Sequence, residues 1–180
     1  ISLQMNLLNN PLIWILRVRH RCGYGVHSPF AFQFLTNVVY EQSAYYAYEE
    51  LDKDLSVAQR MRYRKGLHLL FRLANWLQPA TIVTPENASQ AKAYMQAGCK
   101  KAVILSTIPS NGADMILLNK PDDLAANKVK NGGILLLDNL HHNRKWLRNL
   151  PATLTFDLYD IGIAIYDDKL IKQHYIINFE

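Results

Sequence analysis

The sequence predicts an α/β fold, and three observations support this class. Short apolar runs of four or five residues, rich in Ile, Val and Leu, recur after residue 80. Helix-forming stretches separate most of these runs, and such strand–helix–strand alternation is typical of a parallel sheet. Before residue 80, apolar residues instead recur every three or four positions, as they do on helices. We therefore expect a helical region over residues 1–79 and an α/β core over residues 80–180, together forming one compact domain.

Three helices are expected in the first region, over residues 3–20, 29–42 and 67–77. The second helix is expected to begin at Pro29 with Ser28 as its N-cap, because proline has no N–H donor to leave unpaired at the first helical position. The third helix is expected to end before Pro79, since proline cannot continue a helix. A turn at residues 23–25 separates the first two helices.

Four short strands and two helices are expected in the core. The strands have the composition of strands buried on both faces and cover residues 81–84, 102–106, 115–118 and 134–137. The helices cover residues 88–97 and 122–130, and a glycine near the end of each stretch is typical of a helix stop. Residues 154–168 and 173–179 predict two longer antiparallel strands around a turn at residues 167–169.

Composition favours a folded protein without a membrane segment. Apolar residues make up 49% of the 180 residues, and charged residues only 19%. No apolar run reaches the roughly 18 residues of a membrane helix. The two cysteines are too few for a disulfide framework and no signal peptide pattern is present, so we expect a cytoplasmic protein.

The charge pattern allows a nucleic-acid partner without favouring one. Residues 1–80 contain 9 basic and 5 acidic side chains, which gives this half an excess of +4 within the total of +5. The densest basic stretches are residues 17–21 and 60–65, and they are the best case for RNA or a phosphate ligand. A solvated helix face explains both stretches equally well, and we favour that interpretation.

Several motifs resemble a known family. Residues 25–32 read GVHSPFAF, residues 45–49 read YYAYE, and residues 132–139 read GGILLLDN. These motifs resemble a bacterial group of class I S-adenosylmethionine-dependent methyltransferase-like proteins. The resemblance implies a methyltransferase-type, Rossmann-like sheet with a reversed last strand, an N-terminal helical region and a C-terminal antiparallel strand pair.

The chain departs from that family where the cofactor would bind. The first strand is followed by residues 84–89, which contain no glycine, although the backbone must approach the methionine part of the cofactor closely. Residues 106–110 follow the second strand and contain no carboxylate for the ribose hydroxyls. About eight residues separate the second and third strands, which is too few for a helical crossover. We therefore expect a sheet trimmed by one helix–strand unit and a degenerate cofactor site.

Polar residues at the ends of neighbouring strands form the strongest chemical cluster. Asp138 and Asn139 follow one expected strand, and Asn119 follows the strand before it. The resemblance suggests a divalent-metal site, because metal-dependent O-methyltransferases use an Asp-Asn pair and a further Asp at these positions. Asn119 replaces that second carboxylate, so we favour the alternative in which Asp138 and Asn139 cap the following turn.

Other candidate residues are weaker. If S-adenosylmethionine binds, we expect it near Pro85, Glu86 and Asp138. His141 is a candidate general base or ligand. His27 either fixes the turn of its motif or faces the cofactor pocket. Tyrosines 45, 46 and 48 are expected to pack in the core with their hydroxyls at its edge.

Three functions follow in order of preference. The first is a methyltransferase-like protein with no cofactor, which acts by binding or assembly. The second is an active S-adenosylmethionine-dependent methyltransferase with an atypical pocket. The third is an RNA- or phosphate-binding module that uses the N-terminal arginines. A homo-oligomer is compatible with each of them.

Overall fold

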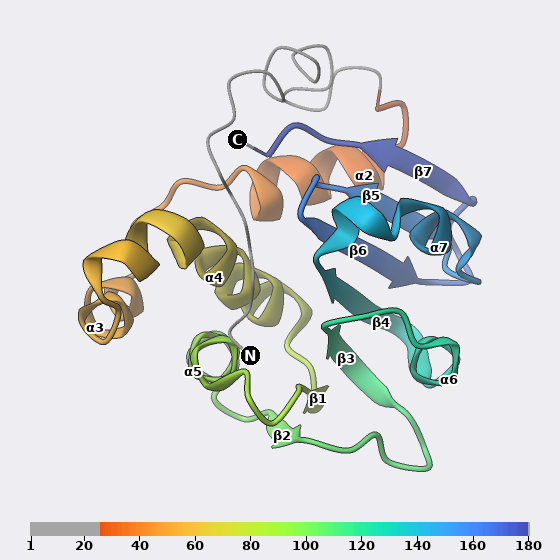
Figure 1. The fold of residues 1–180 in the computed structure, drawn as a ribbon. Coiled ribbons are helices and arrows are strands. Elements are labelled where there is room, and N and C mark those ends of the chain that lie inside the picture. Colours follow the sequence, from red (N-terminus) through yellow and green to blue (C-terminus); the bar gives the residue numbers. More distant parts are fainter. Residues whose placement is uncertain (1–25, 180) are drawn as a thin grey trace.

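The computed structural model describes residues 26–179, which form a seven-stranded mixed sheet with helices on both faces (Figure 1). The prediction of an α/β fold is confirmed. The helices are α2 (Pro29–Phe34), the π-helix η2 (Leu35–Val39), α3 (Tyr46–Lys53), α4 (Val57–Leu77), α5 (Ser89–Gly98), α6 (Asp123–Ala126), the 3₁₀-helix η3 (Leu140–His142) and α7 (Arg144–Asn149). The strands are β1 (Thr81–Val83), β2 (Val103–Leu105), β3 (Ala113–Leu118), β4 (Val129–Asp138), β5 (Leu154–Asp157), β6 (Ile161–Tyr166) and β7 (Gln173–Ile176). The helix expected over residues 3–20 and the turn at residues 23–25 lie outside the described residues.

The helix after Ser28 forms as predicted. Ser28 Oγ accepts a hydrogen bond from Ala31 N at 3.3 Å, and Pro29 is the first helical residue. The helix continues as η2, whose π-type turn is closed by Tyr40 N donating to Leu35 O at 2.8 Å. The helical segment therefore ends a little before the expected residue 42.

Helix α4 begins at Val57, because a capping box starts it. Ser56 Oγ accepts from Gln59 N, and the Gln59 side chain accepts from Ser56 N. This reciprocal pair satisfies two N–H groups that the first turn of a helix leaves unpaired. The helix ends at Leu77, and Gln78 adopts the left-handed conformation directly before Pro79, as the proline predicted.

The sheet has the order β2-β1-β3-β4-β6-β5-β7. Strands β2, β1, β3 and β4 are parallel, while β6 runs antiparallel between β4 and β5. The expectation of two longer antiparallel strands after residue 154 is wrong. The chain instead turns at residues 158–160, where Leu158 N donates to Ile161 O, and so splits the first run into β5 and β6. Since β6 pairs on both edges, β7 adds to the remaining edge of β5, in parallel.

Helix α6 is shorter than the predicted helix over residues 122–130. It ends at Ala126, and Val129 already belongs to β4, where it pairs with Ala113 of β3. Backbone pairing with the neighbouring strand therefore takes these residues from the helix. Residues 106–112 join β2 to β3 without a helix, in agreement with the short spacing in the sequence.

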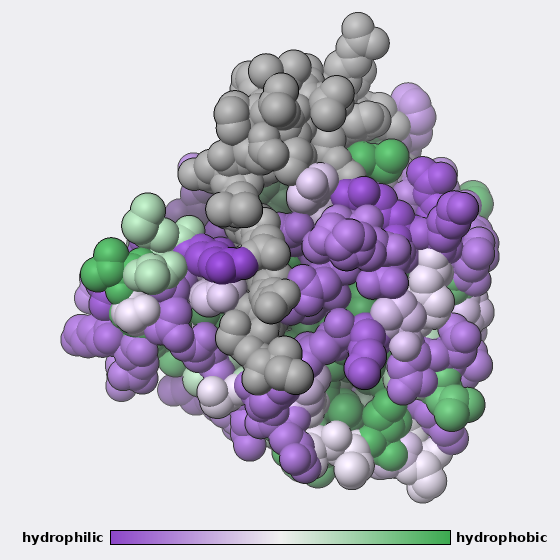
Figure 2. Space-filling model, in the orientation of Figure 1, coloured by the Kyte–Doolittle hydropathy of each residue, from purple (hydrophilic) through white to green (hydrophobic). Residues whose placement is uncertain are grey.

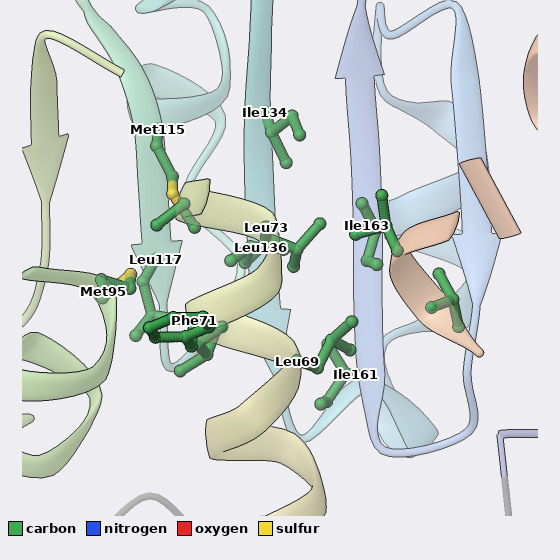
Figure 3. Close-up of a cluster of buried hydrophobic side chains, with 14 of the residues drawn as sticks. Leu69, Phe71, Leu73, Met95, Met115, Leu117, Ile134, Leu136, Ile161 and Ile163 are labelled. Atoms are coloured by element: carbon green, nitrogen blue, oxygen red, sulfur yellow. The ribbon is translucent and has the colours of Figure 1, made fainter. Parts of the chain in front are cut away.

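Two apolar clusters hold the helices against the sheet. On one face, α4 and α5 pack on β3, β4 and β6, and Figure 3 shows the centre of this cluster. The labelled residues there are all buried: Leu69, Phe71, Leu73, Met95, Met115, Leu117, Ile134, Leu136, Ile161 and Ile163. On the opposite face, Leu147 of α7 packs on Leu135, Leu137 and Ala164. The helices before residue 80 thus share one core with the strands.

The surface is mostly hydrophilic on the face in Figure 2, with separate hydrophobic groups, one of them over the start of α4. Val57 and Met61, which are 74% and 83% exposed, lie in that first part of α4. No helix of residues 26–179 combines the length and the apolar character that crossing a membrane requires.

Candidate functional site

The predicted site residues Asn119 and Asp138 lie side by side at the carboxyl edge of the sheet. Leu118 and Leu137, the residues before them, are register partners on β3 and β4. Alternation along each strand places Asn119 and Asp138 on the face that packs against α4. Asp138 is 2% exposed, and its Oδ1 accepts a hydrogen bond from Asn139 N at 3.0 Å.

The same edge is poor in ligands for a cation. Asn119 Oδ1 is buried and has no hydrogen-bond partner within residues 26–179. Asn139 has a left-handed backbone with φ 58°, and its side chain makes no capping hydrogen bond to η3. Within the described chain, no three His, Cys, Asp or Glu side chains form a group that could hold a metal ion. A divalent ion at Asn119, Asp138 and Asn139 would have a single carboxylate ligand, whereas hard cations prefer several.

Pro85 and Glu86 lie in the turn between β1 and α5. Ala88 N closes this turn by donating to Pro85 O at 3.1 Å, and Glu86 is exposed. Thr84 and Ala88, which flank the turn, are each only 3% exposed. Strand β3 lies between β1 and β4, so this turn and Asp138 are about 10 Å apart across the sheet.

The two candidate histidines differ in their surroundings. His27 is exposed, directly before α2. His141 Nδ1 lies 3.8 Å from Asp160 Oδ1, so it has the carboxylate neighbour that the sequence did not reveal. Burial, followed by the charges of His142 and Arg144, lowers the pKa of His141 below its usual range. This lowered pKa favours the neutral form of the His141 ring, next to the buried Asp160.

The clearest hollows lie elsewhere, between the helices before residue 80. One of about 610 Å³ opens between α2–η2 and α4, and one of about 380 Å³ opens between α3 and α4. Four residues line both hollows: Glu41, Gln42, His68 and Arg72. The sequence motifs gave no reason to choose His68 or Arg72 as site residues, although both lie on a helix that the apolar spacing predicted.

Asp52 is the centre of a polar network beside these hollows. Its Oδ2 lies 2.8 Å from Arg64 Nε, and its Oδ1 lies 3.0 Å from His68 Nε2. Tyr94 Oη donates to the same Oδ1 at 2.6 Å, and Arg60 Nε donates to Asp52 O at 2.8 Å. Because Asp52 lies on α3, Arg64 on α4 and Tyr94 on α5, one carboxylate ties three helices together.

This network engages part of the basic stretch at residues 60–65. Arg60 donates to the main-chain oxygen of Asp52, whereas Arg64 pairs with the Asp52 carboxylate. The stretch at residues 17–21, the other basic candidate for nucleic acid, lies outside the described residues. Arg60 and Arg64 therefore have a structural role in this network.

The network shifts the acidity of its members. Burial raises the pKa of Asp52, but hydrogen bonds from Tyr94 and His68 outweigh it, and the net pKa is lowered. Burial also lowers the pKa of His68, against the opposing effect of Asp52. Burial and the hydrogen bond to Asp52 raise the pKa of Tyr94 far above its usual range. The stable arrangement is thus an ionised Asp52 with a neutral His68 and a neutral Tyr94.

An aromatic ring and two main-chain carbonyls hold His68 and Arg72 in place at the wall of the hollows. The Tyr48 ring stacks on the His68 ring, with centroids 3.7 Å apart. Arg72 is 7% exposed, and its Nε and Nη2 donate to Val38 O and Val39 O at 2.6 and 3.0 Å. These contacts fix the orientation of both polar side chains.

Two comparisons with known proteins found no match, so the function of the site is inferred from its geometry. No protein-family model matches the chain, and no curated protein is significantly similar to it.

We expect His68 to titrate below its ordinary pKa of 6.5, because burial disfavours the charged ring. Since the pKa is lowered on folding, the unfolded chain binds the proton more tightly. Neutral His68 then contributes stability above pH 6.5 that is lost as the pH falls. Proton NMR of the ring against pH, in the folded and the urea-unfolded chain, measures both values. A folded value equal to or above the unfolded one would contradict the expectation.

Proposed function

We propose that this chain is a methyltransferase-like protein that has lost its S-adenosylmethionine chemistry and acts by binding or assembly. The strand order supports the scaffold part of the proposal. Strand β6 runs antiparallel between β4 and β5, which agrees with the reversed strand that the resemblance implies, although β7 follows it and β6 is not the last strand. The direct link from β2 to β3 supports the loss of one helix–strand unit.

One observation carries the loss of the cofactor: the turn after β1 contains no glycine, and the residues on both sides of it are buried. A glycine-rich turn at this place lets the backbone approach a cofactor without an intervening Cβ. Here the turn has no glycine, and the Thr84 and Ala88 side chains that flank it are buried. Pro85 also lacks the N–H that could donate to a carboxylate. The turn therefore lacks the features that would bring its backbone close to a cofactor.

The end of β2 agrees with this interpretation. Ser106 follows the strand and is exposed, and the whole link over residues 106–112 contains no carboxylate. A neutral hydroxyl cannot accept hydrogen bonds from both ribose hydroxyls as a carboxylate does. Ribose recognition would thus lack its usual acceptor.

Thermal unfolding with S-adenosylmethionine and S-adenosylhomocysteine tests the proposal. We expect no rise in the unfolding temperature at about 1 mM ligand, because only a ligand that binds the native state stabilises it. Saturable stabilisation would overturn the proposal and favour an active methyltransferase with Pro85, Glu86 and Asp138 around the cofactor. In that case Asp138→Asn should reduce the stabilisation, while the exposed Glu50→Gln variant should leave it unchanged.

A further inference from the structure

The hollow between α2–η2 and α4 has the size and lining of a small-molecule site. Its volume of about 610 Å³ lies in the range of ligand pockets. One part of the wall is apolar or aromatic: Phe32, Val39, Tyr40 and Phe179. Another part carries basic or titratable groups: Lys65, His68 and Arg72. Glu41 is the single carboxylate among the lining residues.

Arg72 is a charged residue of this wall that is buried. It is 7% exposed, yet none of the ion pairs within residues 26–179 includes it. Its bonds to Val38 O and Val39 O satisfy the last carbonyls of η2, which explains how it stabilises that helix end. Main-chain carbonyls carry no opposite charge, and a buried charge is costly unless an opposite charge pairs with it.

His68 adds a second polar group to the same wall. Its Nε2–H donates to the ionised Asp52, so Nδ1 of the neutral ring is a hydrogen-bond acceptor and does not bind the anionic group of a ligand. Stacking on Tyr48 fixes the plane of the ring. Lys65 lies on the same side of α4, with Nζ 4.6 Å from the centre of the Phe179 ring. Cationic donors and aromatic surface thus meet in one hollow.

We propose that this hollow binds a small organic anion, with its carboxylate or phosphate on Arg72 and its apolar part against Phe32, Val39 and Phe179. The remaining N–H donors of a guanidinium suit the paired oxygens of either group. The inference rests on the binding role proposed above and names the ligand class for it. The site differs from the carboxyl edge of the sheet, where a cofactor would bind.

The test uses phenyl phosphate and benzoate as probes, followed by NMR of the labelled protein. We expect saturable shifts at the amides of Thr36, Gln42 and His68, with dissociation constants of about 1 mM for such small probes. The stronger of the two probes identifies the anionic group. Uncharged benzyl alcohol and inorganic phosphate should each bind at least tenfold more weakly than the better probe.

Thr36→Trp tests the location without removing a charge. Thr36 is exposed and lines the hollow, whereas the neighbouring Asn37 is exposed and does not. We expect Thr36→Trp to weaken probe binding at least tenfold and the matched Asn37→Trp variant to leave it unchanged. Equal binding by both variants, equal binding of benzyl alcohol or of inorganic phosphate, or no saturable shift up to about 10 mM would overturn the inference. Stabilisation by S-adenosylmethionine that survives Thr36→Trp would contradict the proposed function alone.

Discussion

Replacing Asp52 by Ala is expected to lower the free energy of unfolding by about 3 kcal/mol, because it removes the acceptor of a buried network. Arg64, His68 and Tyr94 all contact the Asp52 carboxylate, and they come from two other helices. Without it, the buried Tyr94 hydroxyl loses its hydrogen-bond acceptor. The contact of α3 with α4 and α5 weakens at the same time. Urea unfolding followed by circular dichroism measures the loss.

Asp54→Ala is the matched control for this prediction. Asp54 is exposed at the C-terminal end of α3, so the same substitution there should change the free energy of unfolding by no more than about 0.5 kcal/mol. Tyr94→Phe removes only the hydroxyl and should cost about 1 kcal/mol. If Asp52→Ala costs no more than Asp54→Ala, the carboxylate does not hold the helices together.

The stability lost in Asp52→Ala should also depend on pH, and the pKa of Asp52 determines the direction of this dependence. Folding lowers the pKa of Asp52, so the unfolded chain binds the proton more tightly than the folded one. The stability from ionised Asp52 is therefore fully present above the ordinary value of 3.8 and is lost as the pH falls through the lower folded value. The difference between wild type and Asp52→Ala should shrink below that pH.

Local pattern predicted the parallel half of the sheet well and the C-terminal half less well. Strands β1, β3 and the second half of β4 are apolar runs largely buried on both faces, and this composition marks them without knowledge of their partners. Strand β2 is also apolar but lies at the edge of the sheet, where Val103 is 58% exposed. Pairing after residue 154 depends on which strand edges remain available. Both edges of β6 are occupied by β4 and β5, and no local pattern in residues 173–179 reveals that. Turn and strand composition alone therefore favoured a simple hairpin.

The residues of the candidate sites were likewise predicted only in part. The rule that parallel strands end at one edge correctly brought Asn119 close to Asp138. The Asp52 network was missed, because the partners of its carboxylate lie 12 to 42 residues away on two other helices. One signal was present: Arg60, Arg64, His68 and Arg72 recur every four residues, which places them on one side of α4. Which carboxylate meets that side depends on tertiary packing.

Gly98 ends α5, as the sequence predicted, and it has a second role that the sequence did not reveal. The sequence marked it as a helix stop, a role in which glycine usually adopts a positive φ. The positive-φ glycines of the described chain are Gly112 and Gly132, so Gly98 does not need that conformation. Its second role is close packing: a Cβ added there would lie 2.4 Å from Phe71 O and 3.1 Å from the Ala74 Cβ, both on α4.

Gly98→Ala is therefore expected to destabilise the protein by about 3 kcal/mol, since α4 and α5 must separate to admit the methyl group. The sign of the change in stability shows whether the added methyl group clashes. Within a helix, Gly→Ala without a clash stabilises by about 1 kcal/mol. Ala93→Gly, at an exposed position of the same helix, supplies the reference, because it should cost only that intrinsic difference. Urea unfolding of both variants compares them with the wild type. A Gly98→Ala protein as stable as the wild type would mean that α4 and α5 lie further apart than the structure places them.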